Sequence, residues 1–314
     1  MDRNLALEFV RVTEAAAIAA AKWIGRGDKL GADGAAVDAM RSRLNQIDFK
    51  GVVVIGEGSK DEAPELYNGE KVGTGKGPSM DLAIDPLEAT DSVAYGRYDS
   101  LSIIVAGPRG TLLRAPDTYM SKIVVGPDAK NVIDLDAPVK VNLVKIAHAL
   151  GKDISELTVV VLDRERHKKL IEDIRKTGAR ARLITDGDVA PAIATCNSDS
   201  GIDVVMGVGG STEGVLAAAA VKIFGGEILC RFKPRSEADV KEIKRLGVKN
   251  LNKVFKASDL AKGKELTFTA TGIIDGYLLK GVVFEGNNRV ITHSIVIRGQ
   301  SGTIRYITAH HLLK

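Results

Sequence analysis

The sequence has few cysteines and few aromatic residues for its 314 positions. The two cysteines, Cys196 and Cys230, cannot form a disulfide framework, and both lie in apolar contexts that predict reduced core residues. Aromatic residues make up only 4% of the chain, which leaves little material for the stacking platforms that bind single-stranded nucleic acid. These shortages count against a disulfide-stabilised scaffold and against a nucleic-acid-binding protein.

Long apolar runs and blocks of one charge are also missing. No apolar stretch approaches the about 18 residues that a membrane-spanning helix needs, and the N-terminal residues predict an amphipathic helix rather than a signal peptide. We therefore expect a cytoplasmic protein with no membrane partner. The net charge is +4, with Lys and Arg alternating with Asp and Glu. Such an excess suits small anionic ligands better than a nucleic-acid duplex.

The hydrophobic pattern predicts an α/β protein with two lobes, and its character changes near residue 136. The first lobe, 1–136, is predicted as α+β, with helices at 4–25 and 33–47 and strands at 51–56, 80–85, 101–106, 111–114 and 121–125. The second lobe, 137–314, begins with strands at 157–162, 180–185 and 202–206 that alternate with helices at 141–150, 165–177, 188–195 and 213–224. That alternation predicts a largely parallel sheet covered by helices. Antiparallel hairpins are predicted after it, from strands at 266–274, 277–284, 291–298 and 303–308.

The most informative stretch runs from Met80 to Thr90. Its apolar alternation predicts a strand that ends in an Asp85-Pro86 turn, followed by Glu88 and then by Thr90 where a helix can begin. Two carboxylates, a hydroxyl and a helix N-terminus could hold a divalent metal ion, orient water and receive a phosphate. An Asp-Pro turn with a Thr helix cap is the simpler interpretation of the same residues.

Further carboxylates follow the other predicted elements of the first lobe. Glu57 lies between two glycines just after a strand, and Lys29 and Asp33 flank the start of the second helix. Mg²⁺ and Mn²⁺ prefer such hard oxygen ligands, whereas a zinc site would need the His or Cys cluster that is missing here. Asp61, like its neighbour Glu62 and Asp81, could equally be a solvated surface residue.

The second lobe carries polar residues at three successive strand ends, where open α/β sheets bind ligands. Arg164 and Arg166 follow one strand and suit a phosphate, and the carboxylates of 186–188 follow the next and suit sugar hydroxyls. Helix caps would explain the same residues singly. The glycine-rich loop 207–214 can direct backbone N–H groups at an anion, but it lacks the spacing of a Walker A or a Rossmann loop. Glu213 in this loop is either a metal ligand or an acid that stabilises the helix dipole.

Several long motifs, in order and at comparable spacing, give the chain a family resemblance. They are Gly25-Arg-Gly-Asp-Lys29, Ala32-Asp-Gly-Ala-Ala-Val-Asp-Ala-Met-Arg41, Ile55-Gly-Glu-Gly58, Asp61-Glu-Ala-Pro64, Gly69-Glu-Lys-Val-Gly-Thr-Gly75, Asp85-Pro-Leu-Glu88, Ala115-Pro-Asp-Thr-Tyr-Met120, Asp186-Gly-Asp188 and Gly209-Gly210 with Glu213. With these motifs the chain resembles the class II fructose-1,6-bisphosphatases, within the metal-dependent, lithium-sensitive type of sugar phosphatase. The resemblance implies a layered αβαβα sugar-phosphatase fold. It also implies hydrolysis of the 1-phosphate of fructose 1,6-bisphosphate, a step of gluconeogenesis, with two Mn²⁺ or Mg²⁺ ions per site.

The same resemblance implies roles for residues of this chain. The implied metal ligands are Asp33, Glu57, Asp85, Glu88 and Glu213. The implied catalytic residues are Thr90, which would help to orient the attacking water, with Asp33, Lys29 and Asp61. The implied substrate-binding residues are Glu88, Ala89, Thr90, Tyr119, Arg164, Glu165, Arg166, Asp186, Gly187, Asp188 and Gly210.

Three residues depart from the family pattern. Ala89 stands where glycine is usual beside the phosphate, Ser59 where a glutamate is common, and Glu165 where proline is usual. We therefore keep two alternatives, a phosphatase that also or instead hydrolyses sedoheptulose 1,7-bisphosphate and a weakly active protein that binds sugar phosphates. The resemblance further suggests a homodimer or a homotetramer.

Overall fold

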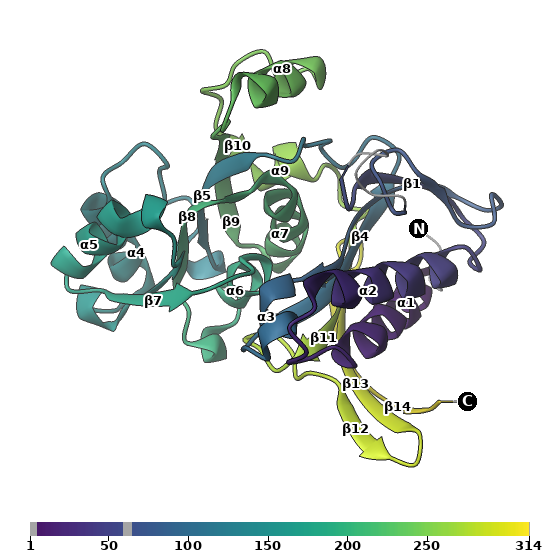
Figure 1. The fold of residues 1–314 in the computed structure, drawn as a ribbon. Helices are drawn as coiled ribbons and strands as arrows, with labels where there is room; N and C mark the ends of the chain where they lie inside the picture. The colour runs from purple at the N-terminus through teal and green to yellow at the C-terminus, as the bar shows by residue number, and fades with distance from the viewer. Residues whose placement is uncertain (1–4, 59–64, 314) are drawn as a thin grey trace. The chain divides into compact units, whose positions relative to one another are not determined.

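The computed structural model describes residues 5–58 and 65–313 (Figure 1). The chain divides into two compact units, one made of Met1–Leu113 with Gly263–Lys314 and the other of Arg114–Lys262. Both units combine helices with a mixed β-sheet, which confirms the predicted α/β class. Among the described residues, no helix is both long and apolar enough to cross a membrane.

The first unit contains an eight-stranded sheet with helices from the N-terminal part of the chain. Its elements are α1 (Leu5–Ala21), α2 (Lys29–Leu44), β1 (Lys50–Ile55), β2 (Lys71–Val72), β3 (Ser79–Glu88), α3 (Thr90–Tyr95), β4 (Ser100–Pro108), β11 (Thr267–Ile274), β12 (Val283–Gly286), β13 (Arg289–Arg298) and β14 (Thr303–Leu312). The strand order is β12-β13-β11-β4-β3-β1-β2, and β14 pairs with β13. β1 and β3 are parallel, whereas β3 and β4, and β4 and β11, are antiparallel.

Helices α1 and α2 pack on this sheet through their apolar faces. Phe9 of α1 and Met40 of α2 are fully buried in the same cluster as Phe49, which precedes β1. The rings of Phe9 and Phe49 meet edge to face, with centroids 5.6 Å apart. Burying a side chain of this size stabilises the fold by about 1.5–3 kcal/mol, so this cluster fixes α2 and the start of β1 beside the sheet.

Several details of the first unit differ from the sequence-based predictions. Helix α2 begins at Lys29 rather than near 33, because Asp28 caps it and accepts a hydrogen bond from the Gly31 N–H at 2.9 Å. Strand β3 does not end at Asp85-Pro86 but continues to Glu88, with a register irregularity that accommodates a residue without an N–H. The predicted strand 111–114 is absent, because Thr111 turns back and donates to the Pro108 carbonyl.

The second unit contains a six-stranded sheet in the order β10-β9-β5-β8-β6-β7. Its elements are β5 (Tyr119–Val125), η1 (Pro127–Ala129), α4 (Val139–Leu150), η2 (Ile154–Glu156), β6 (Thr158–Leu162), η3 (Glu165–His167), α5 (Lys168–Lys176), β7 (Arg180–Ile184), α6 (Val189–Ala194), η4 (Ser198–Ser200), β8 (Val204–Gly210), α7 (Ser211–Phe224), β9 (Glu227–Phe232), α8 (Glu237–Arg245), β10 (Phe255–Lys256) and α9 (Ala257–Leu260). β6 is parallel to both β7 and β8, as the alternating pattern predicts.

The sheet of the second unit is mixed rather than largely parallel. β5 lies between β8 and β9 and is antiparallel to both. The predicted lobes 1–136 and 137–314 therefore differ from the observed units at both ends. β5 belongs to the second unit, and the C-terminal strands return to the first unit, where β11 pairs with β4. The predicted strand 277–284 also shrinks to β12, at Val283–Gly286.

Candidate active site

Two carboxylates of the first unit lie close enough to repel each other. Asp33 is in the second turn of α2, and Glu57 follows β1, where its N–H donates to the Leu66 carbonyl at 3.1 Å. Burial raises the pKa of Asp33, and burial together with the charge of Asp33 raises the pKa of Glu57 to about 8. A divalent cation would offset both penalties, so this pair suits a metal ion with oxygen ligands.

The end of β3 presents two more carboxylates. Asp85 accepts a hydrogen bond from the Leu87 N–H at 3.1 Å, and the buried Glu88 is fixed by its carbonyl, which accepts from the Ser100 hydroxyl at 2.7 Å. A regular strand would direct residues 85 and 88 to opposite faces. The register irregularity between them breaks that alternation.

The residue that joins β3 to α3 has an unusual backbone conformation. Ala89 has φ 65° and ψ 55°, the left-handed region, and it is buried. Thr90 then starts α3, as the sequence predicts, and its hydroxyl donates to the Leu87 carbonyl at 3.2 Å. The Thr90 hydroxyl oxygen therefore keeps its capacity to accept a hydrogen bond from a water molecule.

Other predicted residues of the first unit are placed as follows. Lys29 forms an ion pair with Asp91, and its ammonium lies 5.4 Å from the centre of the Tyr95 ring. Asp81 is not a solvated surface residue, because it is buried and accepts hydrogen bonds from Arg109 and from the Gly110 N–H. Asp61, Glu62 and Ser59 lie outside the described residues.

The predicted ligand set does not appear as one cluster. Within 5–58 and 65–313, no three side chains of His, Cys, Asp or Glu gather in a way that could hold a metal ion. The structure brings Asp33 and Glu57 together as a pair and places Asp85 and Glu88 on a single strand.

In the second unit, Tyr119 lies against two arginines. The Arg166 guanidinium is 4.6 Å from the centre of the Tyr119 ring and that of Arg235 is 5.1 Å from it. Two nitrogens of Arg166, Nε and Nη2, also donate to the Val208 carbonyl at 3.1 and 2.9 Å. Arg166 is thus held in place by contacts that leave Nη1 to donate to a ligand.

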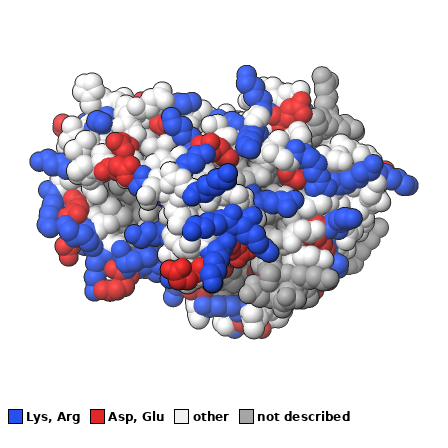
Figure 2. Space-filling view, turned by 90° about the horizontal axis from the view of Figure 1, so that it is seen from above, with Lys and Arg blue, Asp and Glu red and all other residues white. Residues whose placement is uncertain are grey.

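The residues around Arg166 include the departure at position 165. Glu165 is exposed and forms an ion pair with Lys168 at 2.6 Å. Arg164 lies 3.9 Å from Asp186, so the loops after β6 and β7 are electrostatically linked. Figure 2 shows that basic side chains on one face of the protein are interspersed with acidic ones, as expected from the sequence.

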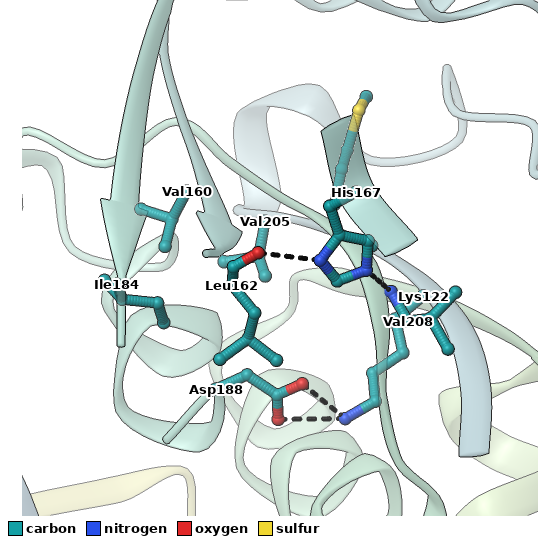
Figure 3. Close-up of a pocket in the computed structure, with 10 residues that line it drawn as sticks. Lys122, Val160, Leu162, His167, Ile184, Asp188, Val205 and Val208 are labelled. Carbon is teal, nitrogen blue, oxygen red and sulfur yellow. Dashed lines mark hydrogen bonds and ion pairs between the residues drawn. The ribbon is translucent and has the colours of Figure 1, made fainter. Parts of the chain in front are cut away.

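A small pocket lies among strands β5, β6, β7 and β8 of the second unit (Figure 3). Its cavity volume of about 10 Å³ is close to the minimum that holds one water molecule. Lys122 and Asp188 line it, and the Lys122 ammonium donates to both Asp188 carboxylate oxygens at 2.9 and 2.7 Å. His167 lines it as well: its Nδ1 bonds the Leu162 carbonyl and its Nε2 accepts from the Val208 N–H, each at 2.7 Å.

Two consecutive glycines at the end of β8 allow acidic side chains to approach the backbone. A Cβ on Gly209 would lie 2.1 Å from an Asp188 oxygen, and a Cβ on Gly210 would lie 1.8 Å from a Glu213 oxygen. Glu213 is in the first turn of α7 and accepts from the Thr212 hydroxyl at 2.8 Å. Burial raises the pKa of Glu213, and the positive charge of the nearby Lys122 partly offsets this increase.

Three residues around this site, Lys122, His167 and Arg235, are not among those predicted from the sequence. Lys122 had a usable signal, because it is a single cation within an otherwise apolar strand, and such a residue needs a buried partner. His167 and Arg235 gave no comparable signal, since each resembles an ordinary surface residue next to other charges.

The first unit contains a pair of partly buried carboxylates, and the second contains arginines around a tyrosine. Both features are typical of enzymes that act on phosphate esters. Comparison with known proteins agrees. Residues 3–311 match the family described as bacterial fructose-1,6-bisphosphatase, glpX-encoded. The chain belongs to this family, which is one of metal-dependent phosphatases.

Individual relatives give the same result. The chain is 47% identical over 325 aligned positions to fructose-1,6-bisphosphatase 1 class 2 of Escherichia coli K12, and the match covers 100% of this chain and 96% of that relative. The class 2 enzyme of Shigella flexneri matches with the same identity and coverage. A solved structure, an extragenic suppressor from Pyrococcus furiosus, shares 13% identity with a TM-score of 0.31, and covers 60% of this chain and 69% of its own. The predicted family and the predicted enzyme class, a fructose-1,6-bisphosphatase, are confirmed.

Proposed function

We propose that this phosphatase removes the 1-phosphate of fructose 1,6-bisphosphate with the help of two Mn²⁺ or Mg²⁺ ions. The observation that carries this proposal is the Asp33–Glu57 pair, two partly buried carboxylates whose charges oppose each other. Buried like charges persist in proteins when a cation or a proton compensates them. Asp33 and Glu57 are the proposed ligands of one ion.

Asp85, Glu88 and Glu213 are the proposed ligands of the second ion. Their carboxylate oxygens are the hard donors that Mn²⁺ and Mg²⁺ prefer. When bound, the cations neutralise phosphate charge and lower the pKa of a coordinated water. Lys29 and Asp61 are proposed to support catalysis.

The segment 88–90 is proposed to receive the phosphate that leaves. The Thr90 hydroxyl donates to the Leu87 carbonyl, so it can accept a hydrogen bond from the attacking water and fix the direction of attack. The left-handed backbone at Ala89 turns the chain between the strand and the helix at this point.

The sugar bisphosphate is proposed to bind in the second unit. Tyr119, Arg164, Arg166, Asp186, Gly187 and Gly210 are the proposed contacts. Arg166 is the main one, because stacking on Tyr119 and two hydrogen bonds to Val208 fix its guanidinium before any ligand arrives. We propose that Asp188 supports this site indirectly, because both of its carboxylate oxygens accept hydrogen bonds from Lys122.

Phosphate release from fructose 1,6-bisphosphate, measured after chelation and again after adding Mn²⁺ or Mg²⁺, tests this function. We expect turnover only with a divalent cation, and a larger kcat/KM for this substrate than for sedoheptulose 1,7-bisphosphate. Tight binding of the bisphosphate without phosphate release, at any metal concentration, would instead support the weakly active alternative.

Replacing Arg166 by alanine is expected to raise KM for fructose 1,6-bisphosphate by about 10- to 100-fold and to lower kcat much less, because a charge-assisted hydrogen bond to phosphate contributes about 1.5–3 kcal/mol. Arg175→Ala is the matched control, since this arginine is exposed on α5. Steady-state kinetics of both variants measure the difference. An unchanged KM for Arg166→Ala would remove this residue from the substrate site.

Replacing Ala89 by glycine is expected to change the unfolding free energy by less than about 1 kcal/mol, because opposing effects nearly cancel. Relief of the left-handed strain gains about 1–2 kcal/mol, whereas the lost methyl burial costs about 0.8 kcal/mol and the looser unfolded chain about 0.4–1 kcal/mol. The kcat should rise at least about threefold, since small displacements of a reacting group slow a reaction. An unchanged kcat would show that the methyl group does not hinder the phosphate.

The compartment and the assembly are further proposals. Cys196 and Cys230 are unpaired, and burial raises the pKa of their thiols to about 11 and about 12, so both stay protonated and unreactive. This chemistry supports a cytoplasmic enzyme.

A homodimer or a homotetramer is proposed, and light scattering of the purified chain distinguishes the two.

A further inference from the structure

Lys122 is a cation in the middle of an apolar strand. Its side chain is 4% exposed, and it extends from β5 to a carboxylate that follows β7, although β8 and β6 lie between these strands in the sheet. Burial alone would lower the pKa of Lys122, but the nearby Asp188 and Glu213 outweigh burial and raise it, so the residue remains charged. The ion pair therefore fixes the loop that follows the edge strand β7 to β5, which lies further inside the sheet.

The ion pair with Lys122 also restrains the loop that contains Asp188. It is the residue directly before α6, and Gly187 before it has φ 68°, a left-handed turn. Its carboxylate occupies the space that a Cβ on Gly209 would take, so β8 needs a glycine there for the ion pair to close. Asp186, one of the proposed sugar contacts, is two residues away.

His167 anchors the neighbouring loop in the same way. Because its Nε2 accepts the Val208 N–H, its Nδ1 carries the proton and donates to the Leu162 carbonyl. The imidazole is buried and spans from the end of β6 to the end of β8. Burial lowers the pKa of His167, which keeps the ring neutral, as this bonding requires.

The side chains of Lys122 and His167 both line the small pocket of Figure 3. Val208 connects His167 to a substrate residue, because its N–H donates to His167 while its carbonyl accepts from Arg166. The loop with Arg164 and Arg166 is thus fixed to β8 by the buried His167, and the loop with Asp186 is fixed to β5 by the buried Lys122.

We propose that Lys122 and His167 are positioning residues for the sugar bisphosphate, which hold the two substrate loops at the spacing that the ligand requires. This inference rests on the proposed function, which assigns those loops to the substrate. Neither residue needs to touch the ligand, because the pocket between them is of the size of a water molecule. Lys122 and His167 hold the arginine and carboxylate side chains of the two loops in place before the ligand binds. These side chains would otherwise lose conformational entropy on binding.

A purely structural ion pair in the same unit provides the control. Lys152 binds the buried Asp203 at 2.6 Å, and Asp203 also accepts from the Thr158 N–H at 2.8 Å. Thr158 begins β6 and Asp203 precedes β8, so this pair lies at the start of the parallel strands β6 and β8, whereas the substrate loops follow the ends of β6 and β7. Lys152→Met therefore breaks a more exposed ion pair to a buried carboxylate at the opposite ends of these strands.

The experiment measures binding of fructose 6-phosphate to the metal-free chain by calorimetry, together with the melting temperature of each variant. For Lys122→Met we expect affinity to fall at least about tenfold, as for the loss of supporting contacts at other sites, with KM rising more than kcat falls. Lys122→Arg should recover affinity to within about threefold of the original chain. Lys152→Met should lower the melting temperature but keep affinity within about twofold.

His167→Gln tests the second anchor and remains informative if Lys122→Met does not fold. We expect it also to weaken fructose 6-phosphate binding about tenfold. The inference is overturned if either folded variant binds within twofold of the original chain, or if Lys152→Met weakens binding as much as Lys122→Met. Failure of the proposed function gives a different result, because the original chain itself would then not bind fructose 6-phosphate and Arg166→Ala would have no effect.

Discussion

The Asp85→Ala variant is expected to lose Mn²⁺-dependent phosphate release from fructose 1,6-bisphosphate by about 10³-fold or more. Removing one group that stabilises transition-state charge already slows an enzyme by about 10²–10³-fold, and a metal ligand has the additional task of holding the ion. The fold should persist, because the hydrogen bond that Asp85 accepts from the Leu87 N–H is typically worth only about 1 kcal/mol. Phosphate release at saturating Mn²⁺, with circular dichroism of the same sample, measures both effects.

Asp38→Ala is the matched control for this variant. Asp38 is an exposed acid on α2, and its removal changes the charge of the chain by the same amount. Its activity should stay within about twofold of the original, in keeping with the small effects of ordinary surface substitutions. If the Asp85→Ala variant kept its activity while remaining folded, Asp85 would not be a metal ligand.

The second large effect concerns the pH dependence of stability without metal. The pKa of Glu57 is about 8 in the folded chain and about 4.5 in the unfolded chain. Between these values the folded state binds a proton that the unfolded state has released, so stability falls as pH rises from about 4.5 to about 8. The Glu57→Gln variant cannot lose this proton, and we expect it to avoid a destabilisation on the order of 4 kcal/mol over this range.

Denaturant unfolding at pH 5 and pH 8.5 in the presence of a chelator measures this effect as a difference between the two chains. Other buried acids cancel in that difference, including Asp99, whose pKa burial raises to about 7 in both. Added Mn²⁺ should remove the pH dependence of the original chain, because a bound cation favours the charged carboxylate. Equal pH dependence of the two chains would contradict the placement of Glu57 beside Asp33.

Local patterns predicted much of the fold. The alternation of apolar runs and helical stripes predicted the order of elements from β6 to α7, and Thr90 was correctly predicted as a helix start. The position of β5 could not be predicted, because its place between β8 and β9 is decided by pairing with residues at least 79 positions later in the chain. Pro86 suggested a turn, but the neighbouring strands accommodate it within β3.

The sequence was less informative about how the candidate site is held together. Motifs identified Asp33, Glu57 and Arg166, since ligand chemistry limits which residue types can act there. Lys122 lies outside every motif, because its partner is 66 positions away in the sequence and is found only through the sheet. Glu165 was noted only as a departure from the family pattern, and its ion pair with Lys168, one helical turn later, is visible only in the structure.

The position of Mn²⁺ in crystals of the chain, located by anomalous scattering with fructose 6-phosphate present, tests the central claim most directly. We expect one ion within about 2.5 Å of carboxylate oxygens of both Asp33 and Glu57, a distance typical of such ligands, and a second ion on Asp85. Ions bound only at other residues, in a preparation that releases phosphate with Mn²⁺, would contradict it.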